Sequence, residues 1–172
     1  MTKIALVTGA SRGLGRNTAL NIARHGGDVV VTYQSSSEEA QAVVAEIIAI
    51  GRKAIALQLD TGNVASFAEF ADRLAEALRD NWQRENFDHL VNNAGHDIGG
   101  RTRFDQGPAD DWTAIIQTNL VGLMRVTRAV LPSMVERNDG HIVNVSSVNG
   151  VIASSHDGLA VATTSGTPRG ER

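Results

Sequence analysis

The sequence of 172 residues lacks several features that mark whole classes of protein. It contains no cysteine, which excludes a disulfide framework, a thiolate metal site and a thiol nucleophile. Its lysines are Lys3 and Lys53 alone, no Lys/Arg cluster occurs and the formal net charge is -3, so the chain is not expected to bind nucleic acid. No apolar run approaches the roughly 20 residues of a membrane span, and the first residues do not resemble a secretory signal. We therefore expect a cytoplasmic globular protein with no membrane partner and no bound metal.

Apolar residues make up 42% of the chain, which suffices for one buried core in a domain of this length. Short apolar runs, typical of buried strands, alternate with segments of helical periodicity. The expected strands are residues 4–7, 29–31, 54–59, 87–91 and 141–145. This alternation predicts an α/β fold, a doubly wound parallel sheet with helices on both faces and strand order 3-2-1-4-5.

Two segments lack any apolar period. Residues 96–108 are polar, contain glycines and one proline, and are expected to form a loop before a long helix that Pro132 kinks or restarts. After Ile152 the periodicity ends, and ten of the nineteen residues 154–172 are Ser, Thr, Gly or Pro. We therefore expect one domain over residues 1–152 and a disordered tail over 153–172.

A glycine-rich turn follows the first predicted strand, with Gly9, Gly13 and Gly15 in the spacing G-x-x-x-G-x-G. Such glycines allow a tight turn, so that the next helix can present its N-terminus to a pyrophosphate. A turn without a ligand is the alternative, but the position in the first βαβ unit favours a nucleotide. The expected cofactor-binding residues of this turn are Gly9, Ala10, Ser11, Arg12, Gly13, Leu14 and Gly15.

The end of the second strand indicates which nicotinamide cofactor is bound. An NAD site needs a carboxylate there for the ribose 2′-hydroxyl, whereas this chain has Tyr33, Gln34 and Ser35, with no acid before Glu38. Hydroxyl and amide groups suit a 2′-phosphate, and Arg12 could pair with it. NADP(H) is therefore favoured over NAD, with Gln34 as a binding residue; for Arg12 the alternative is an ordinary solvated loop arginine.

Four motifs in the same order resemble the short-chain dehydrogenase/reductase family: Thr8 to Gly15, Asn92 to Gly95, Asn119, and the strand from Ile142 to Ser147. The match covers about residues 3–152 and is closest to members that resemble 3-oxoacyl-[acyl-carrier-protein] reductases. The resemblance implies a Rossmann fold, homo-oligomers, and hydride transfer between a nicotinamide cofactor and a carbonyl or alcohol substrate.

The resemblance also implies roles for residues beyond the glycine turn. Asp60 and Thr61 correspond to the segment beside the adenine ring, although a turn aspartate that caps the next helix is an equal alternative for Asp60. The adenosine side is implied to be lined by Asn92, Asn93, Ala94 and Gly95.

Two candidate catalytic residues follow from the same resemblance. Asn119, an amide among apolar neighbours of a helix, matches the residue that supports a proton-relay water. Ser147 matches the catalytic serine, with Ser146 as the neighbouring alternative.

The family's Tyr-x-x-x-Lys pair is missing from the sequence. The single tyrosine is Tyr33 and no lysine follows Lys53; residues 159–161 and 163–165 are Leu-Ala-Val and Thr-Thr-Ser instead. His156 is the one titratable base nearby, and an idle histidine is its expected state. Two explanations stay open: a C-terminal part truncated or altered after about residue 152, so that the fold is incomplete there, or a protein that binds NADP(H) as a sensor or interaction module.

The family's intersubunit packing has a consequence for this chain. In the family, the helix that carries Asn119 packs across subunits together with the Tyr-x-x-x-Lys helix. Without that partner we expect Trp112, Ile116 and Leu123 to stay partly exposed and the fifth strand to form an open edge. A homo-oligomer, which the family implies, is correspondingly less expected here.

Overall fold

The computed structural model describes residues 2–96 and 109–147, which form one parallel sheet in the order β3-β2-β1-β4-β5. The strands are β1 (Ile4–Val7), β2 (Asp28–Tyr33), β3 (Ala54–Gln58), β4 (His89–Asn92) and β5 (His141–Asn144). The predicted fold class and strand order are thus confirmed. The expected boundary at residue 152, the tail 153–172 and residues 97–108 of the expected loop lie outside the described residues.

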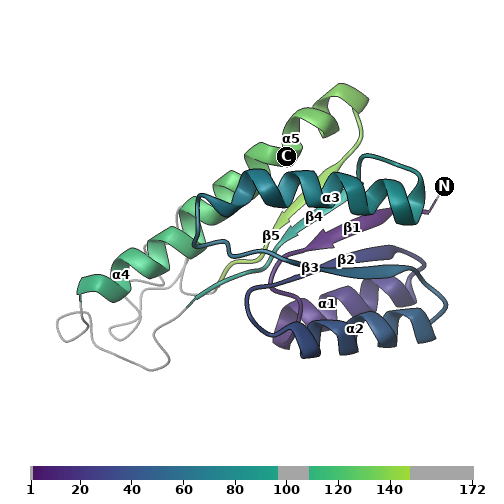
Figure 1. Cartoon of the computed structure of the whole chain (residues 1–172), viewed down its shortest axis with the longest axis horizontal. Helices are drawn as coiled ribbons and strands as arrows, with labels where there is room; N and C mark the ends of the chain where they lie inside the picture. The colour runs from purple at the N-terminus through teal and green to yellow at the C-terminus, as the bar shows by residue number, and fades with distance from the viewer. Residues whose placement is uncertain (1, 97–108, 148–172) are drawn as a thin grey trace.

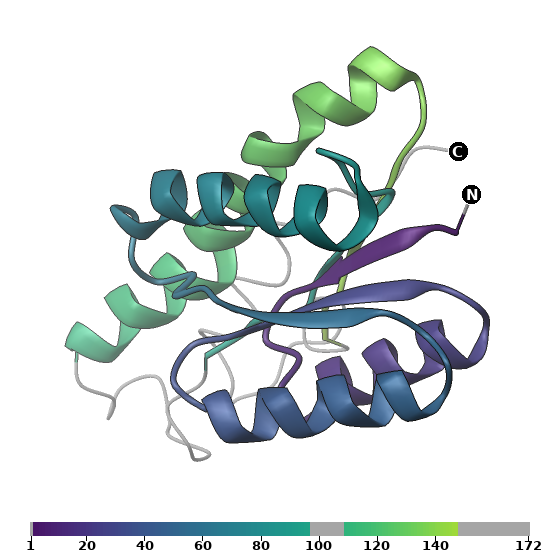
Figure 2. The ribbon, with the colours of Figure 1, turned by 45° about the vertical axis from the view of Figure 1, so that its right-hand side comes forward.

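Helices cover the sheet in two layers (Figures 1 and 2). One layer is formed by α1 (Gly13–Arg24) and α2 (Ser37–Ala49). The other contains α3 (Ser66–Trp82) and α5 (Leu123–Arg137), the latter reached through α4 (Ala109–Ile116) and the π-helical turn η1 (Gln117–Gly122). This arrangement is what a doubly wound sheet requires, since its central strands are apolar on both faces.

Alternate residues of the central strands bury their side chains in two separate clusters. Val7 and Val31 point toward α1 and α2, where they pack with Ala19 and Ile47. On the opposite face, residues of β1, β2 and β4 pack with α3 and α5 in a cluster that includes Ile4, Leu6, Val30, Leu74, Leu90 and Val126. The period-two alternation of a strand therefore divides one apolar run between two cores.

The long helix contains both Pro132 and a π-helical turn that the sequence did not predict. Pro132 lies inside α5, which continues through it without restarting. The irregular segment is instead η1, which contains Asn119. Pro132 is exposed, so the carbonyl group that loses an N–H partner at this proline can bond to water.

Apolar side chains stay exposed along α5 and β5. The exposed fractions are 59% for Met124, 68% for Val135 and 52% for Val143. Ile116 is exposed and Trp112 and Leu123 are half-buried, as expected. Among the described strands, β5 pairs with β4 alone.

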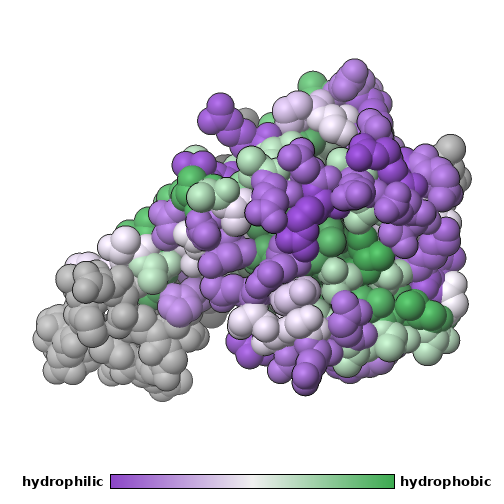
Figure 3. All heavy atoms as spheres, in the orientation of Figure 1, coloured by the Kyte–Doolittle hydropathy of each residue, from purple (hydrophilic) through white to green (hydrophobic). Residues whose placement is uncertain are grey.

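The space-filling view shows hydrophilic side chains over α3 and hydrophobic atoms between α3 and the α1–α2 layer (Figure 3). No helix in the described part of the chain combines the length and apolarity that a bilayer span requires.

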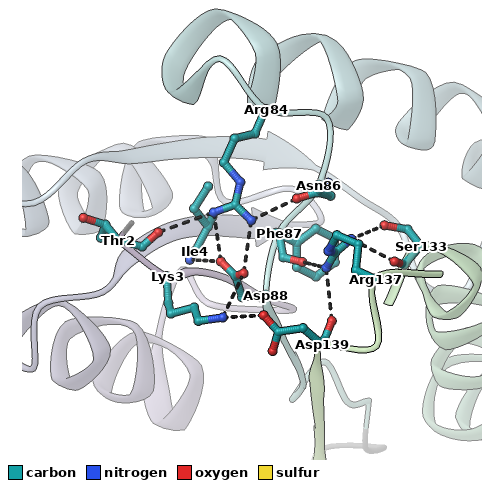
Figure 4. Close-up of polar contacts among 10 residues, drawn as sticks. All are labelled: Thr2, Lys3, Ile4, Arg84, Asn86, Phe87, Asp88, Ser133, Arg137 and Asp139. Carbon is teal, nitrogen blue, oxygen red and sulfur yellow. Dashed lines mark hydrogen bonds and ion pairs between the residues drawn. The ribbon is translucent and has the colours of Figure 1, made fainter. Parts of the chain in front are cut away.

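A polar network holds the amino-terminal edge of the sheet (Figure 4). Asp88, whose side chain is almost fully buried, accepts from the Ile4 N–H at 2.8 Å and from both terminal nitrogens of Arg84 at 3.1 Å. Burial by itself would raise the pKa of Asp88, but the hydrogen bonds from Arg84 and Ile4 outweigh it and the pKa is lowered. Arg137, at the end of α5, donates to the Phe87 carbonyl at 2.9 Å. The network thus joins β1, the start of β4 and the end of α5.

Candidate functional site

A pocket of about 310 Å³ lies where the chain leaves the carboxyl ends of β1, β2, β3 and β4. Strands β2 and β4 flank β1 on opposite sides, so this is the point at which the direction of the strand order reverses. Open α/β sheets bind their ligands in the crevice at such a point. The lining residues are Gly9, Ser11, Arg12, Tyr33, Gln34, Ser35, Ser36, Leu59, Asp60, Thr61, Asn93, Ala94, Gly95, His96 and Thr118.

The glycine turn adopts a shape that other residues would not allow. Gly9 and Gly13 have φ angles of +62° and +56°. A Cβ at Gly9 would lie 2.9 Å from the Ala94 Cα, and one at Gly15 would lie 2.5 Å from the Gly9 carbonyl oxygen. The glycines therefore let the turn, the start of α1 and the segment after β4 approach one another closely.

Two neighbouring strands hold this turn through hydrogen bonds. On the β4 side, the Thr8 hydroxyl accepts from the N–H groups of Asn93 and Ala94, both at 2.9 Å. The Asn93 amide donates back to the carbonyl oxygens of Thr8 (2.9 Å) and Gly9 (3.2 Å). On the β2 side, Thr32 accepts from Gly9 and Ala10. Asn93 therefore anchors the turn as well as lining the pocket.

The other predicted residues of the turn shape it without lining the pocket. Ala10 and Gly15 are buried, and Gly13 is the first residue of α1, whose first turn contains no acidic side chain. Leu14 points outward and is largely exposed. An N-terminus free of acids presents its unpaired N–H groups to an anion without repulsion.

The wall after β2 contains hydroxyl and amide groups and no carboxylate. Tyr33, Gln34 and Ser35 line it beside the exposed Arg12. The Gln58 side-chain amide, on β3, donates to the Gln34 carbonyl oxygen at 2.8 Å and ties this segment to the next strand. The side of the pocket after β2 thus carries polar groups and the Arg12 guanidinium.

Asp60 bonds within the turn after β3 and does not cap the next helix, since α3 begins at Ser66 without a side-chain cap. Its carboxylate accepts from the Gly62 N–H at 2.9 Å, which is a turn contact, and the residue also lines the pocket together with Thr61. Gly122 of η1 lies directly against the Thr61 backbone, with no room for a Cβ. The π-helical turn thus supports the segment after β3.

Asn92 lies behind the pocket rather than in its lining. Its side-chain amide donates to the Thr127 hydroxyl at 3.0 Å and to the Asn144 side-chain oxygen at 2.9 Å, and so links β4 to α5 and β5. The residue is buried, and its own side-chain oxygen has no hydrogen-bond partner among the described residues. Asn92 therefore supports the strand end that carries Asn93.

The Asn119 side-chain amide forms two hydrogen bonds with the backbone of His96. Its oxygen accepts from the His96 N–H at 2.7 Å, and its nitrogen donates to the His96 carbonyl oxygen at 3.0 Å. These bonds explain how an amide is accommodated among apolar neighbours of a helix. They also fix the end of the Asn93–His96 segment, while Thr118 beside Asn119 reaches the pocket itself.

Ser147 follows β5 by three residues and is half-buried. The Val145 N–H donates to the Asn92 carbonyl oxygen at 2.9 Å, so the chain after β5 leaves the sheet beside the chain after β4. Ser147 therefore lies on the same edge of the sheet as the pocket, without lining it. His156 and residues 159–165 lie outside the described residues.

Residues 3–163 match the family described as short chain dehydrogenase. The chain belongs to this short-chain dehydrogenase/reductase family. It is 44% identical over 152 residues to a 3-oxoacyl-[acyl-carrier-protein] reductase of Synechocystis sp., an alignment that covers 88% of this chain and 58% of that protein. The chain thus spans about three fifths of the length of the curated relatives it matches.

Solved structures of the family resemble this chain closely. A metagenomic short-chain oxidoreductase in complex with NADP has a TM-score of 0.83 at 32% identity, covering 94% of this chain and 70% of that one. A short-chain dehydrogenase from Sphingobium yanoikuyae in complex with NADPH has a TM-score of 0.81 at 32% identity, covering 95% and 61%.

Sequence reasoning missed two polar residues of the site. Thr32 and Thr118 bring hydroxyl groups to the turn and to the pocket, respectively. For Thr32 a signal existed, since a hydroxyl within a buried run of valines needs a partner. No group of three or more acidic or histidine side chains suited to a metal ion occurs within residues 2–96 and 109–147.

Proposed function

We propose that the pocket binds NADP(H). The observation that carries this proposal is the glycine turn, whose Gly9, Ser11 and Arg12 line a polar pocket directly before the N-terminus of α1. Binding of a pyrophosphate there uses Gly9, Ser11 and the first N–H groups of α1. The family membership and the NADP and NADPH complexes of the structural relatives support the same cofactor.

The preference for NADP(H) over NAD rests on the wall after β2. A 2′-phosphate at this wall would meet the Arg12 guanidinium and the polar groups of Gln34 and Ser35, with no carboxylate among residues 33–36. Asp60, on the neighbouring wall, has one carboxylate oxygen bonded to Gly62 and is assigned to the adenine side together with Thr61. The segment Asn93–Gly95 supports the adenosine from the β4 side.

We further propose that this site serves an oxidoreductase acting on a carbonyl or alcohol, with a 3-oxoacyl thioester as the substrate class named for its relatives. The nicotinamide supplies or accepts the hydride. Among the described residues, Ser147 is the hydroxyl assigned to polarise the carbonyl oxygen, and Asn119 positions the end of the Asn93–His96 segment. A cytoplasmic location is part of the same proposal.

A second candidate function is NADP(H) binding without turnover, as a sensor or an interaction module. It is favoured by the absence of a Tyr-x-x-x-Lys pair from the sequence, in which Tyr33 is the one tyrosine and Lys53 the last lysine. General acid catalysis at the carbonyl oxygen requires a proton donor with a tuned pKa, which the tyrosine of that pair would supply.

Fluorescence titration of the full chain with NADPH and with NADH tests the binding proposal. We expect saturable binding of both, with NADPH at least about tenfold tighter because of the pairing with the 2′-phosphate. Arg12→Gln should remove most of that preference while NADH binding stays within about twofold. Arg73→Gln, on the exposed side of α3, is the matched control. If neither nucleotide binds, the proposal is wrong.

Turnover distinguishes the two candidate functions. NADPH oxidation is followed with a 3-oxoacyl thioester and with simple ketones, for the wild type and for Ser147→Ala. Consumption that depends on Ser147 supports the oxidoreductase. Tight NADPH binding without consumption of any of these carbonyl compounds supports the binding module.

A further inference from the structure

Thr32 is a polar residue at a place where the sheet is otherwise apolar. It follows Val29, Val30 and Val31 in β2 and is 1% exposed. A buried hydroxyl group costs free energy unless it forms a hydrogen bond. A threonine at this position therefore needs a hydrogen-bond partner, whereas a valine would need none.

The partner is the glycine turn. The Thr32 hydroxyl oxygen accepts from the Gly9 N–H at 3.2 Å, and the Thr32 carbonyl oxygen accepts from the next N–H, that of Ala10, at 2.8 Å. Two consecutive N–H groups are thus bonded to one residue of β2. Ser11 and Arg12, the next residues of the turn, line the pocket.

The conformation of Gly9 cannot be fixed by a side chain of its own. It has a positive φ angle and no side chain, and Ala94 lies 2.9 Å from the place of its missing Cβ. From the β4 side the turn is held through Thr8 and Asn93. Thr32 supplies the corresponding bonds from the β2 side, and Tyr33 next to it already lines the pocket.

We propose that Thr32 is a positioning residue for the nucleotide, whose hydroxyl group fixes Gly9 so that the turn keeps the shape that binds the pyrophosphate. This inference rests on the proposed NADP(H) site. Valine has nearly the shape of threonine, but it would leave the Gly9 N–H without its acceptor. The Gly9 N–H would then bond to water or to another acceptor, and the turn would change shape. Phosphate binding would be weaker, because part of its free energy would be spent on restoring that shape.

A matched pair of variants isolates the hydroxyl group. Thr32→Val keeps the shape and removes the acceptor, whereas Thr32→Ser keeps the acceptor and removes a methyl group. In NADPH titrations we expect Thr32→Val to raise Kd by about tenfold and Thr32→Ser to stay within about twofold of the wild type. The thermal midpoint of each variant shows how much of the effect is loss of fold, since a merely structural role would lower the midpoint and leave the Kd of the folded protein unchanged.

The outcomes separate this inference from the proposed function. A wild type that binds no NADPH overturns the proposed function itself. A wild type that binds, with Thr32→Val equal to it or with both variants weakened equally, overturns the role of the Thr32 hydroxyl alone.

Amide hydrogen exchange of the wild type tests the same bond if Thr32→Val does not fold. The Gly9 N–H should be protected without any nucleotide, because its acceptor belongs to the sheet. Exchange of Gly9 as fast as that of an unstructured glycine would overturn the inference.

Discussion

Lys3 and Asp139 are 136 positions apart in the sequence and form an ion pair with 2.6 Å between the Lys3 Nζ and the Asp139 Oδ2. Lys3 precedes β1 at the centre of the sheet, and Asp139 precedes β5 at its edge (Figure 4). The same Nζ lies 3.4 Å from Asp88, before β4. The amino ends of three neighbouring strands are therefore joined through one lysine.

This network should limit the pH range over which the fold is most stable. Hydrogen bonding with Lys3 lowers the pKa of Asp139, and the pKa of Asp88 is lowered as well. Their contribution is present above the unfolded value, near 3.8, and is lost as the pH falls through the lowered pKa values. Hydrogen bonding with Asp139 raises the pKa of Lys3 above 10.5, so its contribution is lost as the pH rises through that raised value.

Thermal midpoints measured across the pH range should accordingly form a plateau with an acid and an alkaline limb. Lys3→Met should flatten the alkaline limb and weaken the acid one. A wild-type profile equal to that of Lys3→Met would contradict the role of this lysine.

Asp88→Asn should destabilise the fold by about 2 kcal/mol. The substitution places an amide against the half-buried Arg84 guanidinium, which then lacks its carboxylate partner. Urea unfolding gives the free energy difference. Asp72→Asn, on the exposed side of α3, is the control and should change the free energy of unfolding by less than about 0.5 kcal/mol.

A histidine pair on β4 and β5 should make the sheet edge sensitive to mild acid. His89 and His141 are register partners with ring centroids 5.3 Å apart. Burial, and next the neighbouring His141, lower the pKa of His89 below 6.5. The neutral ring is therefore favoured in the folded state, and stability should fall as the pH drops below the unfolded value of about 6.5.

His141→Gln should reduce this loss of stability between pH 7 and pH 5, in thermal midpoints recorded at each pH. An NMR titration of the His89 ring gives the pKa directly. A value at or above 6.5 in the wild type would show that the pair does not act in this way. His25→Gln, at the exposed end of α1, serves as the control.

Gly15→Ala should abolish NADPH binding, or weaken it by more than about a hundredfold. Its Cβ would lie 2.5 Å from both the Gly9 carbonyl oxygen and the Asn93 side-chain nitrogen, so the turn and the β4 segment would have to separate. Gly13→Ala meets no atom within 4 Å but retains the strain of a positive φ angle. It should lower stability by about 1 kcal/mol and change Kd much less. Equal effects of the two substitutions on Kd would argue against the close-approach explanation.

The sequence alone determined the strands, their order and the position of the glycine turn. These features depend on patterns that are local: a buried parallel strand is an uninterrupted apolar run such as Val29–Val31, and a positive φ angle favours glycine. Right-handed crossovers then leave few ways to order the five strands.

The tertiary structure decided which polar side chains line the pocket and which support it from behind. Asn92 and Asn93 are adjacent in the sequence, yet one joins β4 to α5 and β5 while the other holds the glycine turn, because successive residues at a strand end point in different directions. The partners of Asn119, Thr32 and Lys3 come from segments 23 to 136 positions away. Such partnerships depend on how the strands and helices pack, so no local pattern of residue types encodes them.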